Sequence, residues 1–136
     1  MKSKSLSLVF LICFTYVILV SFQAASPLQG VWELTGGKYG KYPFSATKEL
    51  KLQKIYSANG YQVIAVYPNG KTVKNEEGTY TVKNNNDTET QSYHNAASSL
   101  KSKVMQYIFT IKNNKLTIKG TYTNKTPMEE YWKKIK

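Results

Sequence analysis

Hydrophobic and polar residues alternate with a two-residue period along much of this chain. Apolar or aromatic side chains occupy every second position from Met105 to Ile111. The run from Leu116 to Tyr122 repeats the pattern, with Gly120 as its smallest member. Such alternation is typical of strands with one buried face. The pair Asn113-Asn114 between the two runs predicts a tight turn, so together they predict an antiparallel hairpin.

Other stretches of β-branched and aromatic residues, bounded by turn residues, predict further strands. They are Gly30–Thr35, Leu50–Tyr56, Tyr61–Tyr67, Gly78–Val82, Thr88–His94 and Glu129–Ile135. Turns are predicted at Asn59-Gly60, Pro68-Asn69-Gly70 and Asn84–Asp87, and a loop at Asn95–Lys103. The chain is therefore expected to be all-β, with about eight or nine short strands. An up-and-down antiparallel β-barrel is favoured because closure removes exposed sheet edges; a sandwich is the alternative.

The N-terminal segment has the order of a secretory signal peptide. Lys2 and Lys4 precede an apolar run, and Ala24, Ala25 and Ser26 supply small residues for cleavage. We expect a signal peptide at residues 1–25 and one domain at 26–136, secreted or periplasmic. The alternative is an uncleaved segment that anchors the protein in a membrane.

Composition limits the chemistry available to the domain. The 136 residues include 19 lysines and no arginine, against 8 acidic residues, for a net charge of +11. Cys13, Asp87 and His94 are the single members of their residue types. We therefore expect no metal site, no cofactor and no catalytic function. An enzyme would need His94 in a cleft, within hydrogen-bonding reach of a nucleophile or a carboxylate.

The positive charge has three interpretations. Nucleic-acid binding is disfavoured because the chain is predicted to be exported and lacks arginine. Binding to an anionic envelope surface would use exposed lysines, namely Lys38, Lys41, Lys48, Lys51, Lys54, Lys101 and Lys103. Solubility, together with a coding bias toward lysine and asparagine, is slightly favoured. The domain is expected to be monomeric.

The stretch Thr88–His94 predicts a polar strand whichever face points inward. Thr88, Thr90, Ser92 and His94 share one face, and Glu89, Gln91 and Tyr93 share the other. An inward polar face would favour a wet cavity, whereas an edge strand near solvent is the alternative. By the same alternation, the neighbours in Glu76-Glu77 and in Glu129-Glu130 point to opposite faces, which argues against paired carboxylate catalysis.

Short motifs at the two ends of the domain suggest a family. Gly30-Val31-Trp32 opens the first strand, Gly78-Thr79-Tyr80 lies mid-chain, and Glu129-Glu130-Tyr131-Trp132-Lys133 lies near the end. In this order they resemble small secreted bacterial lipocalin-like, or calycin-type, domains. The resemblance implies that Gly30, Trp32 and Trp132 close one end of the barrel. The basic residue over the tryptophan would be Lys133 or its neighbour Lys134.

The resemblance further implies a protein that binds rather than catalyses. We expect it to carry or scavenge a small apolar or amphipathic ligand inside the barrel. The expected ligand-binding residues are Leu50, Leu52, Tyr80, His94, Tyr107, Phe109, Ile118 and Tyr122. The alternative is a secreted protein-interaction or inhibitor module, with a filled barrel and a lysine-rich surface.

Overall fold

The computed structural model describes residues 24–98, 104–122 and 124–136. Within these ranges the chain forms nine β-strands and no helix. The strands are β1 (Gly30–Tyr39), β2 (Tyr42–Ser45), β3 (Lys51–Tyr56), β4 (Gly60–Val66), β5 (Thr72–Lys83), β6 (Asn86–His94), β7 (Val104–Lys112), β8 (Lys115–Thr121) and β9 (Pro127–Lys134). The predicted all-β class is confirmed.

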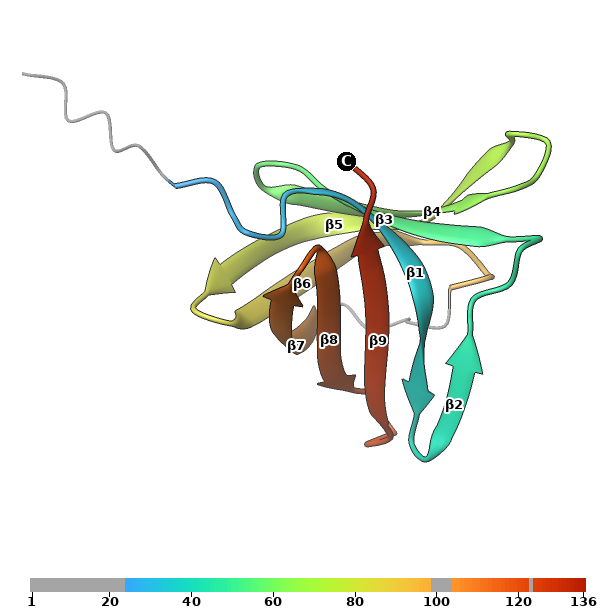
Figure 1. The fold of residues 1–136 in the computed structure, drawn as a ribbon. Helices are drawn as coiled ribbons and strands as arrows, with labels where there is room; N and C mark the ends of the chain where they lie inside the picture. Colours follow the sequence, from blue (N-terminus) through green and yellow to red (C-terminus); the bar gives the residue numbers. More distant parts are fainter. Residues whose placement is uncertain (1–23, 99–103, 123) are drawn as a thin grey trace, which may run out of the picture.

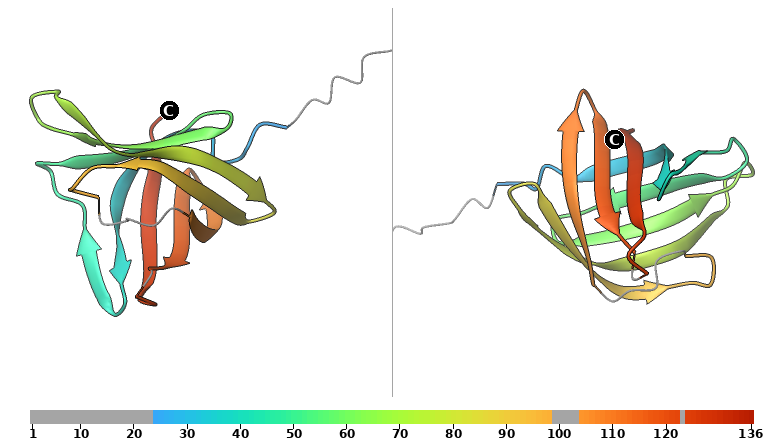
Figure 2. Two further views of the ribbon diagram at one scale, coloured as in Figure 1. Left: turned by 180° about the vertical axis from the view of Figure 1, so that it is seen from behind. Right: turned by 90° about the horizontal axis from the view of Figure 1, so that it is seen from below.

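The strands form an antiparallel barrel that closes on itself. From β3 to β9 each strand pairs with the next in sequence, and β1 pairs with both β3 and β9. In Figure 1 the two ends of this sheet, β1 and β9, run side by side. β2 is outside the closed ring and pairs only with the second half of β1, at Gly36–Tyr39. The architecture is therefore an eight-stranded up-and-down barrel with one extra strand. Figure 2 shows the curved sheet from behind and from below.

Asparagine and glycine make the turns that the sequence predicts. Asn113 and Asn114 have φ values of 51° and 60° between β7 and β8, and Asn84 has φ 56° between β5 and β6. Gly70 has φ 81° between β4 and β5. These residue types tolerate the left-handed region at low cost, so the turns fix the register of the strands they join.

Gly78 allows close packing on the inside of β5. A Cβ atom at this position would lie 2.1 Å from the carbonyl oxygen of Thr90 and 2.9 Å from the ring of Tyr61. The register between β5 and β6 shifts next to Gly78, between Glu77 and Gly78. The missing side chain therefore lets the Tyr61 ring lie against the sheet.

One end of the barrel is closed by Trp32. Its side chain is fully buried, and its Nε1–H donates to the carbonyl oxygen of Leu28 at 2.7 Å. The basic residue over the ring is Lys134, whose Nζ lies 5.2 Å from the ring centroid. Lys133 is exposed on the outer face of β9, so its expected role at the barrel end is corrected to Lys134.

Several expectations concern residues outside the described ranges. The predicted signal peptide at 1–25 falls there except for residues 24 and 25, and so does the loop at 99–103. The described part of the predicted loop, Asn95–Ser98, is a turn. No helix in the described residues is long and apolar enough to cross a membrane.

Candidate functional site

The inner face of β6 carries acidic side chains. Asp87, Glu89 and Gln91 are buried and point into the barrel, whereas Thr90 is exposed on the outside. After a register shift opposite Glu77 and Gly78, Tyr93 is exposed as well. The structure thus selects the inward face that contains Glu89 and Gln91, and the strand is not an edge strand because it pairs with both β5 and β7.

Lys54 on β3 is the cation opposite this acidic wall. Its Nζ lies 2.6 Å from Oε1 of Glu89, and both side chains are almost fully buried. The hydroxyl of Tyr56 donates to Glu89 or to Asp87, whose carboxylate oxygens lie 2.6 Å and 3.0 Å away. Lys54 was expected among the exposed surface lysines, and this expectation is wrong. It occupies the inward face of β3 because it lies two residues from both Leu52 and Tyr56.

Three tyrosine rings surround the Lys54 ammonium. Its Nζ lies 5.4 Å from the ring centroid of Tyr56, 5.3 Å from that of Tyr61 and 5.1 Å from that of Tyr107. Aromatic faces attract cations, and the attraction is larger where water is excluded. The barrel interior therefore holds an ammonium group by one carboxylate and three aromatic rings.

A second acidic pair lines a cavity nearer the barrel end opposite Trp32. Glu76 on β5 and Glu130 on β9 both border a cavity of about 70 Å³. The Ser98 hydroxyl hydrogen bonds to Glu76, and Nε1–H of Trp132 donates to Glu130 at 3.1 Å. The remaining wall is mostly apolar or aromatic, with Lys54 at its base. It comprises Leu34, Tyr39, Leu52, Val63, Asn75 and Ala97.

Burial controls the ionisation of these acids. It raises the pKa of Glu130 to about 7, with partial opposition from the charge of Lys54 and the hydrogen bond from Trp132. It also raises the pKa of Asp87 to about 7, and the nearby Glu89 adds to the effect. The pKa of Glu76 is raised by burial too, against the hydrogen bond from Ser98. Burial acts to lower the pKa of Lys54, but the surrounding carboxylates, Glu89 first, raise it above its ordinary value.

Two buried polar atoms in the described interior have no hydrogen-bond partner. They are Oδ1 of Asp87 and the hydroxyl of Tyr107. Tyr107 is 2% exposed and extends inward from β7. Burial raises the pKa of this phenol, and the charges of Glu89, Glu130 and Glu76 raise it further. An unsatisfied buried hydroxyl is uncommon and indicates a position where a ligand or a water can bind.

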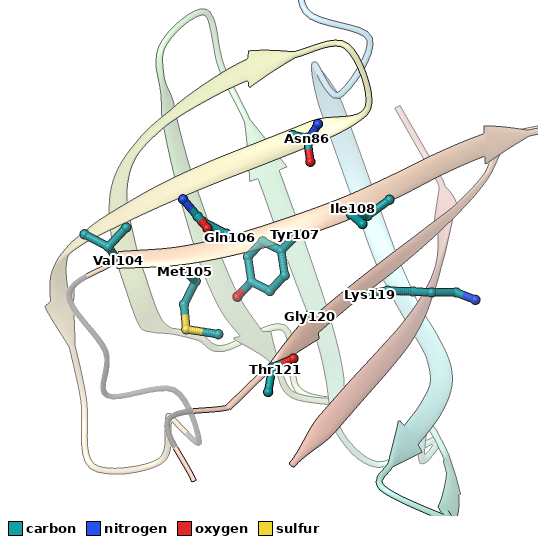
Figure 3. Close-up of a pocket in the computed structure, with 9 residues that line it drawn as sticks. All are labelled: Asn86, Val104, Met105, Gln106, Tyr107, Ile108, Lys119, Gly120 and Thr121. Carbon is teal, nitrogen blue, oxygen red and sulfur yellow. The ribbon is translucent and has the colours of Figure 1, made fainter. Parts of the chain in front are cut away.

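A wider hollow lies where β7 and β8 separate. Their pairing extends only from Ile108 with Lys119 to the turn, so the first residues of β7 are not bonded to β8. The hollow has a volume of about 530 Å³ and is open to solvent. Figure 3 shows that the Tyr107 ring comes close to Gly120, where a Cβ atom would lie 2.8 Å from it. Tyr107 therefore lies between this outer hollow and the charged interior.

The structure brings only some of the expected ligand-binding residues together. Leu52 lines the cavity, and Tyr122 lies near its rim, with its ring 5.5 Å from that of Tyr39. Tyr107 lies beside the charged cluster. The other five expected residues do not line the cavity. Phe109 and Ile118 belong to the apolar core, Tyr80 donates to the carbonyl oxygen of Ser57, and Leu50 and His94 are exposed.

Gly30 and Trp132, which were expected to close one end of the barrel with Trp32, lie at different places in the structure. Gly30 lies at the start of β1, where a Cβ atom would come within 2.5 Å of the Lys136 carbonyl oxygen. Trp132 is buried in the wall of the cavity rather than at the barrel end that Trp32 closes. Among the described residues, no group of three or more His, Cys, Asp or Glu side chains is arranged to hold a metal ion.

The sequence pattern did not identify the charged interior as a site. Lys54 was expected on the surface, and Glu76 and Glu130 were considered only as members of acidic pairs that argue against catalysis. Glu89 was left on one of two possible inward faces of its strand. For two of them, Lys54 and Glu130, the alternation indicates an inward position, because each lies on a strand face that is otherwise apolar or aromatic. Lys54 shares its strand face with Leu52 and Tyr56, and Glu130 lies between Met128 and Trp132 in the same alternation.

Together, the closed antiparallel barrel and its capped end define a lipocalin-like β-barrel protein. Residues 27–136 match a family described as a domain of unknown function, DUF4488, and the chain belongs to this family. No curated protein matches the sequence significantly.

Two solved structures share the fold. A lipocalin-like protein from Bacteroides uniformis ATCC 8492 has a TM-score of 0.60 and 11% identity, over 79% of this chain and 98% of that one. An uncharacterized protein from Bacteroides eggerthii DSM 20697 has a TM-score of 0.59 and 11% identity, over 78% of this chain and 98% of that one. At this identity the likeness concerns the fold, and it confirms the lipocalin-like resemblance of the sequence.

Proposed function

We propose that this protein is an exported, non-catalytic binding protein. It holds a small amphipathic ligand at the barrel end opposite Trp32. The observation that carries the proposal is the cavity between Glu76 and Glu130. It has carboxylates on two sides, Lys54 at its base, and mostly apolar or aromatic side chains elsewhere. Ligand sites commonly combine such apolar walls with a few oriented polar groups.

The size of the cavity determines how a ligand would bind. A volume of about 70 Å³ holds a polar head group but not a whole lipid, since ligand pockets usually have roughly 300–1,000 Å³. The head group would occupy the cavity, and the apolar body would lie across Leu52 and Tyr39 toward the rim. The expectation of a small apolar or amphipathic ligand inside the barrel is thereby narrowed to an amphipathic ligand near the barrel end opposite Trp32.

A protein-interaction module is the second candidate, and the filled interior favours it. Phe109, Leu116 and Ile118 pack with Trp32 in one buried apolar core, and the cavity beside Glu76 and Glu130 has a volume of only about 70 Å³. In that case the surface would carry the function, and the cavity would be a packing defect.

An NMR titration separates these two functions. The labelled domain is titrated with hexyl compounds that carry amine, hydroxyl or carboxylate heads. We expect shifts of the Trp132 indole N–H and of the Leu52 and Ser98 amides. Shifts confined to the outer strand faces, or no shifts with any head group, would contradict a ligand site at this end.

A matched pair of variants supplies the control. Leu52→Trp places a large ring at the cavity wall and should abolish the shifts, whereas Leu50→Trp enlarges an exposed residue just before β3 and should preserve them. Circular dichroism shows whether each variant retains its strands. Equal binding by both variants would place the ligand elsewhere.

A further inference from the structure

The barrel interior contains more acid than base. Asp87, Glu76, Glu89 and Glu130 project into it, whereas Lys54 is the one fully buried lysine among the described residues. Lys54 is already paired, because its Nζ lies 2.6 Å from Glu89. Lys54 also lines the cavity and its charge acts on Glu76 and Glu130, so four interior acids share one buried lysine whose nearest carboxylate is Glu89.

Within the described residues, Glu76 and Glu130 have hydrogen-bond donors but no ion-pair partner in direct contact. Ser98 and Trp132 each donate to one of them. Among the described residues, no lysine or histidine nitrogen lies within 4 Å of either carboxylate. Buried carboxylates are costly without a charged partner, so a cation that enters this cavity gains a strong, specific interaction.

Tyr107 provides an independent indication of a ligand. Its hydroxyl is buried, faces the charged interior and has no partner. It lies in the field of the same acids, Glu89, Glu130 and Glu76. A phenol oxygen can accept one N–H bond, so the charged interior next to the cavity contains one more oxygen without a donor.

The interior already binds one ammonium group in this way. The Lys54 ammonium is held by a carboxylate and by the rings of Tyr56, Tyr61 and Tyr107. The cavity between Glu76 and Glu130 has the same components, namely carboxylates beside the aromatic side chains of Tyr39 and Trp132. Its volume of about 70 Å³ admits an ammonium group together with about one water, given roughly 30 Å³ for each.

We infer that the head group of the ligand is a primary ammonium, held between Glu76 and Glu130 and carried on a short apolar or aromatic body. This inference rests on the proposed function, because it names the chemistry of the same site. A primary ammonium has three N–H donors, which fit two carboxylates and one further oxygen. A hydroxyl offers one donor, and a carboxylate head would meet like charge.

The test is calorimetric titration of the full domain near neutral pH with four probes that share a hexyl chain. Hexylamine should bind at least about tenfold more tightly than hexanol, hexanoate or hexyltrimethylammonium, because charge-assisted hydrogen bonds discriminate by that order. Hexyltrimethylammonium keeps the charge but has no N–H donor. It therefore separates hydrogen bonding from simple attraction.

Neighbouring acids give matched variants. Glu76→Gln and Glu130→Gln should each weaken hexylamine binding about tenfold. Glu77→Gln and Glu129→Gln change the outward neighbours, which pair with Lys74 and Lys119 on the surface, and should stay within about twofold. If Glu130→Gln fails to fold, the comparison of Glu76→Gln with Glu77→Gln carries the test.

The outcomes distinguish this inference from the proposed function. If hexanol or hexanoate binds as tightly as hexylamine and shifts the Trp132 indole, the ammonium inference fails and the amphipathic site stands. If no probe binds, both fail. Lys101 and Lys103 follow Ser98 in the sequence, so Lys101→Gln/Lys103→Gln is titrated in parallel. If hexylamine binds only to that variant, lysines of this chain compete for the site, and the inference is overturned.

Discussion

Lys54 on β3 and Glu89 on β6 form an ion pair in the barrel interior, with their charged atoms 2.6 Å apart and their side chains 4% and 2% exposed. The two strands are not neighbours in the sheet, because β4 and β5 separate them. The pair therefore crosses the inside of the barrel. It links the acidic inner face of β6 to β3, whose Leu52 and Lys54 line the cavity.

Removing one member of this pair should be strongly destabilising. Lys54→Met leaves Glu89 without its cation, and we expect a loss of about 3–5 kcal/mol in the free energy of unfolding. Lys54→Met/Glu89→Leu removes both charges and should cost clearly less than the sum of the single variants. Urea denaturation measures all three. Additive losses would show that the pair is not coupled as the structure indicates.

Stability should fall as the pH rises from mildly acidic to neutral. Burial raises the pKa of Glu130 from 4.5 to about 7, so the folded protein keeps a proton that the unfolded chain has released in this interval. The free energy of unfolding therefore decreases between these pH values and levels off above them. The raised pKa of Asp87 acts in the same direction. Thermal melts across this range measure the slope.

Glu130→Gln should reduce this pH dependence, because it removes one of the two groups. Glu129→Gln on the opposite face of β9 is the control and should leave the slope unchanged. A slope that is the same in both variants would place the titrating group outside the cavity.

Lys134 and Lys133 should differ in their contribution to the closed end. Lys134→Ala removes the ammonium over Trp32 together with the stem that covers it, and should cost about 1 kcal/mol. Lys133 is exposed, so Lys133→Ala should change the free energy of unfolding by less than about 0.5 kcal/mol. Guanidinium melts followed by tryptophan fluorescence compare them. A larger loss for Lys133→Ala would assign the capping role to that residue instead.

Two glycines should also behave differently. Gly78→Ala places a methyl group 2.1 Å from the Thr90 carbonyl oxygen and should cost more than about 4 kcal/mol, or prevent folding. Gly70→Ala introduces strain at φ 81° but meets no atom within 4 Å, so about 1–2 kcal/mol is expected. The solubility and melting temperature of the two variants provide the comparison, and similar losses would contradict the close packing of Tyr61 on β5.

Much of the fold could be predicted because alternation and turn residues agree along the chain. Asn113-Asn114 and Pro68-Asn69-Gly70 both mark turns that the structure contains. The strand β2 was missed because Tyr42–Ser45 is only four residues long and includes Pro43. It pairs with a strand that already has two other partners, an arrangement that local pattern does not encode.

The site was less predictable because alternation assigns a face but not a neighbour. Alternation predicts that Glu76 and Glu130 each lie on the opposite face from the acidic neighbour, which the structure confirms. That β5 and β9 direct these two side chains to one cavity depends on barrel closure. His94 illustrates the converse, since its chemical interest in the sequence gave no information about its exposed position at the end of β6.

Native mass spectrometry of the mature chain, purified gently from its own host, tests the central claim most directly. We expect an adduct of a small amine-bearing molecule that is lost on denaturation. Removal of this molecule should lower the melting temperature of the protein. Leu52→Trp expressed in the same host should lack the adduct, whereas Leu50→Trp should retain it. A bare protein mass, with no stabilisation by any added amphipathic compound, would contradict the claim that this barrel is a small-ligand binding protein.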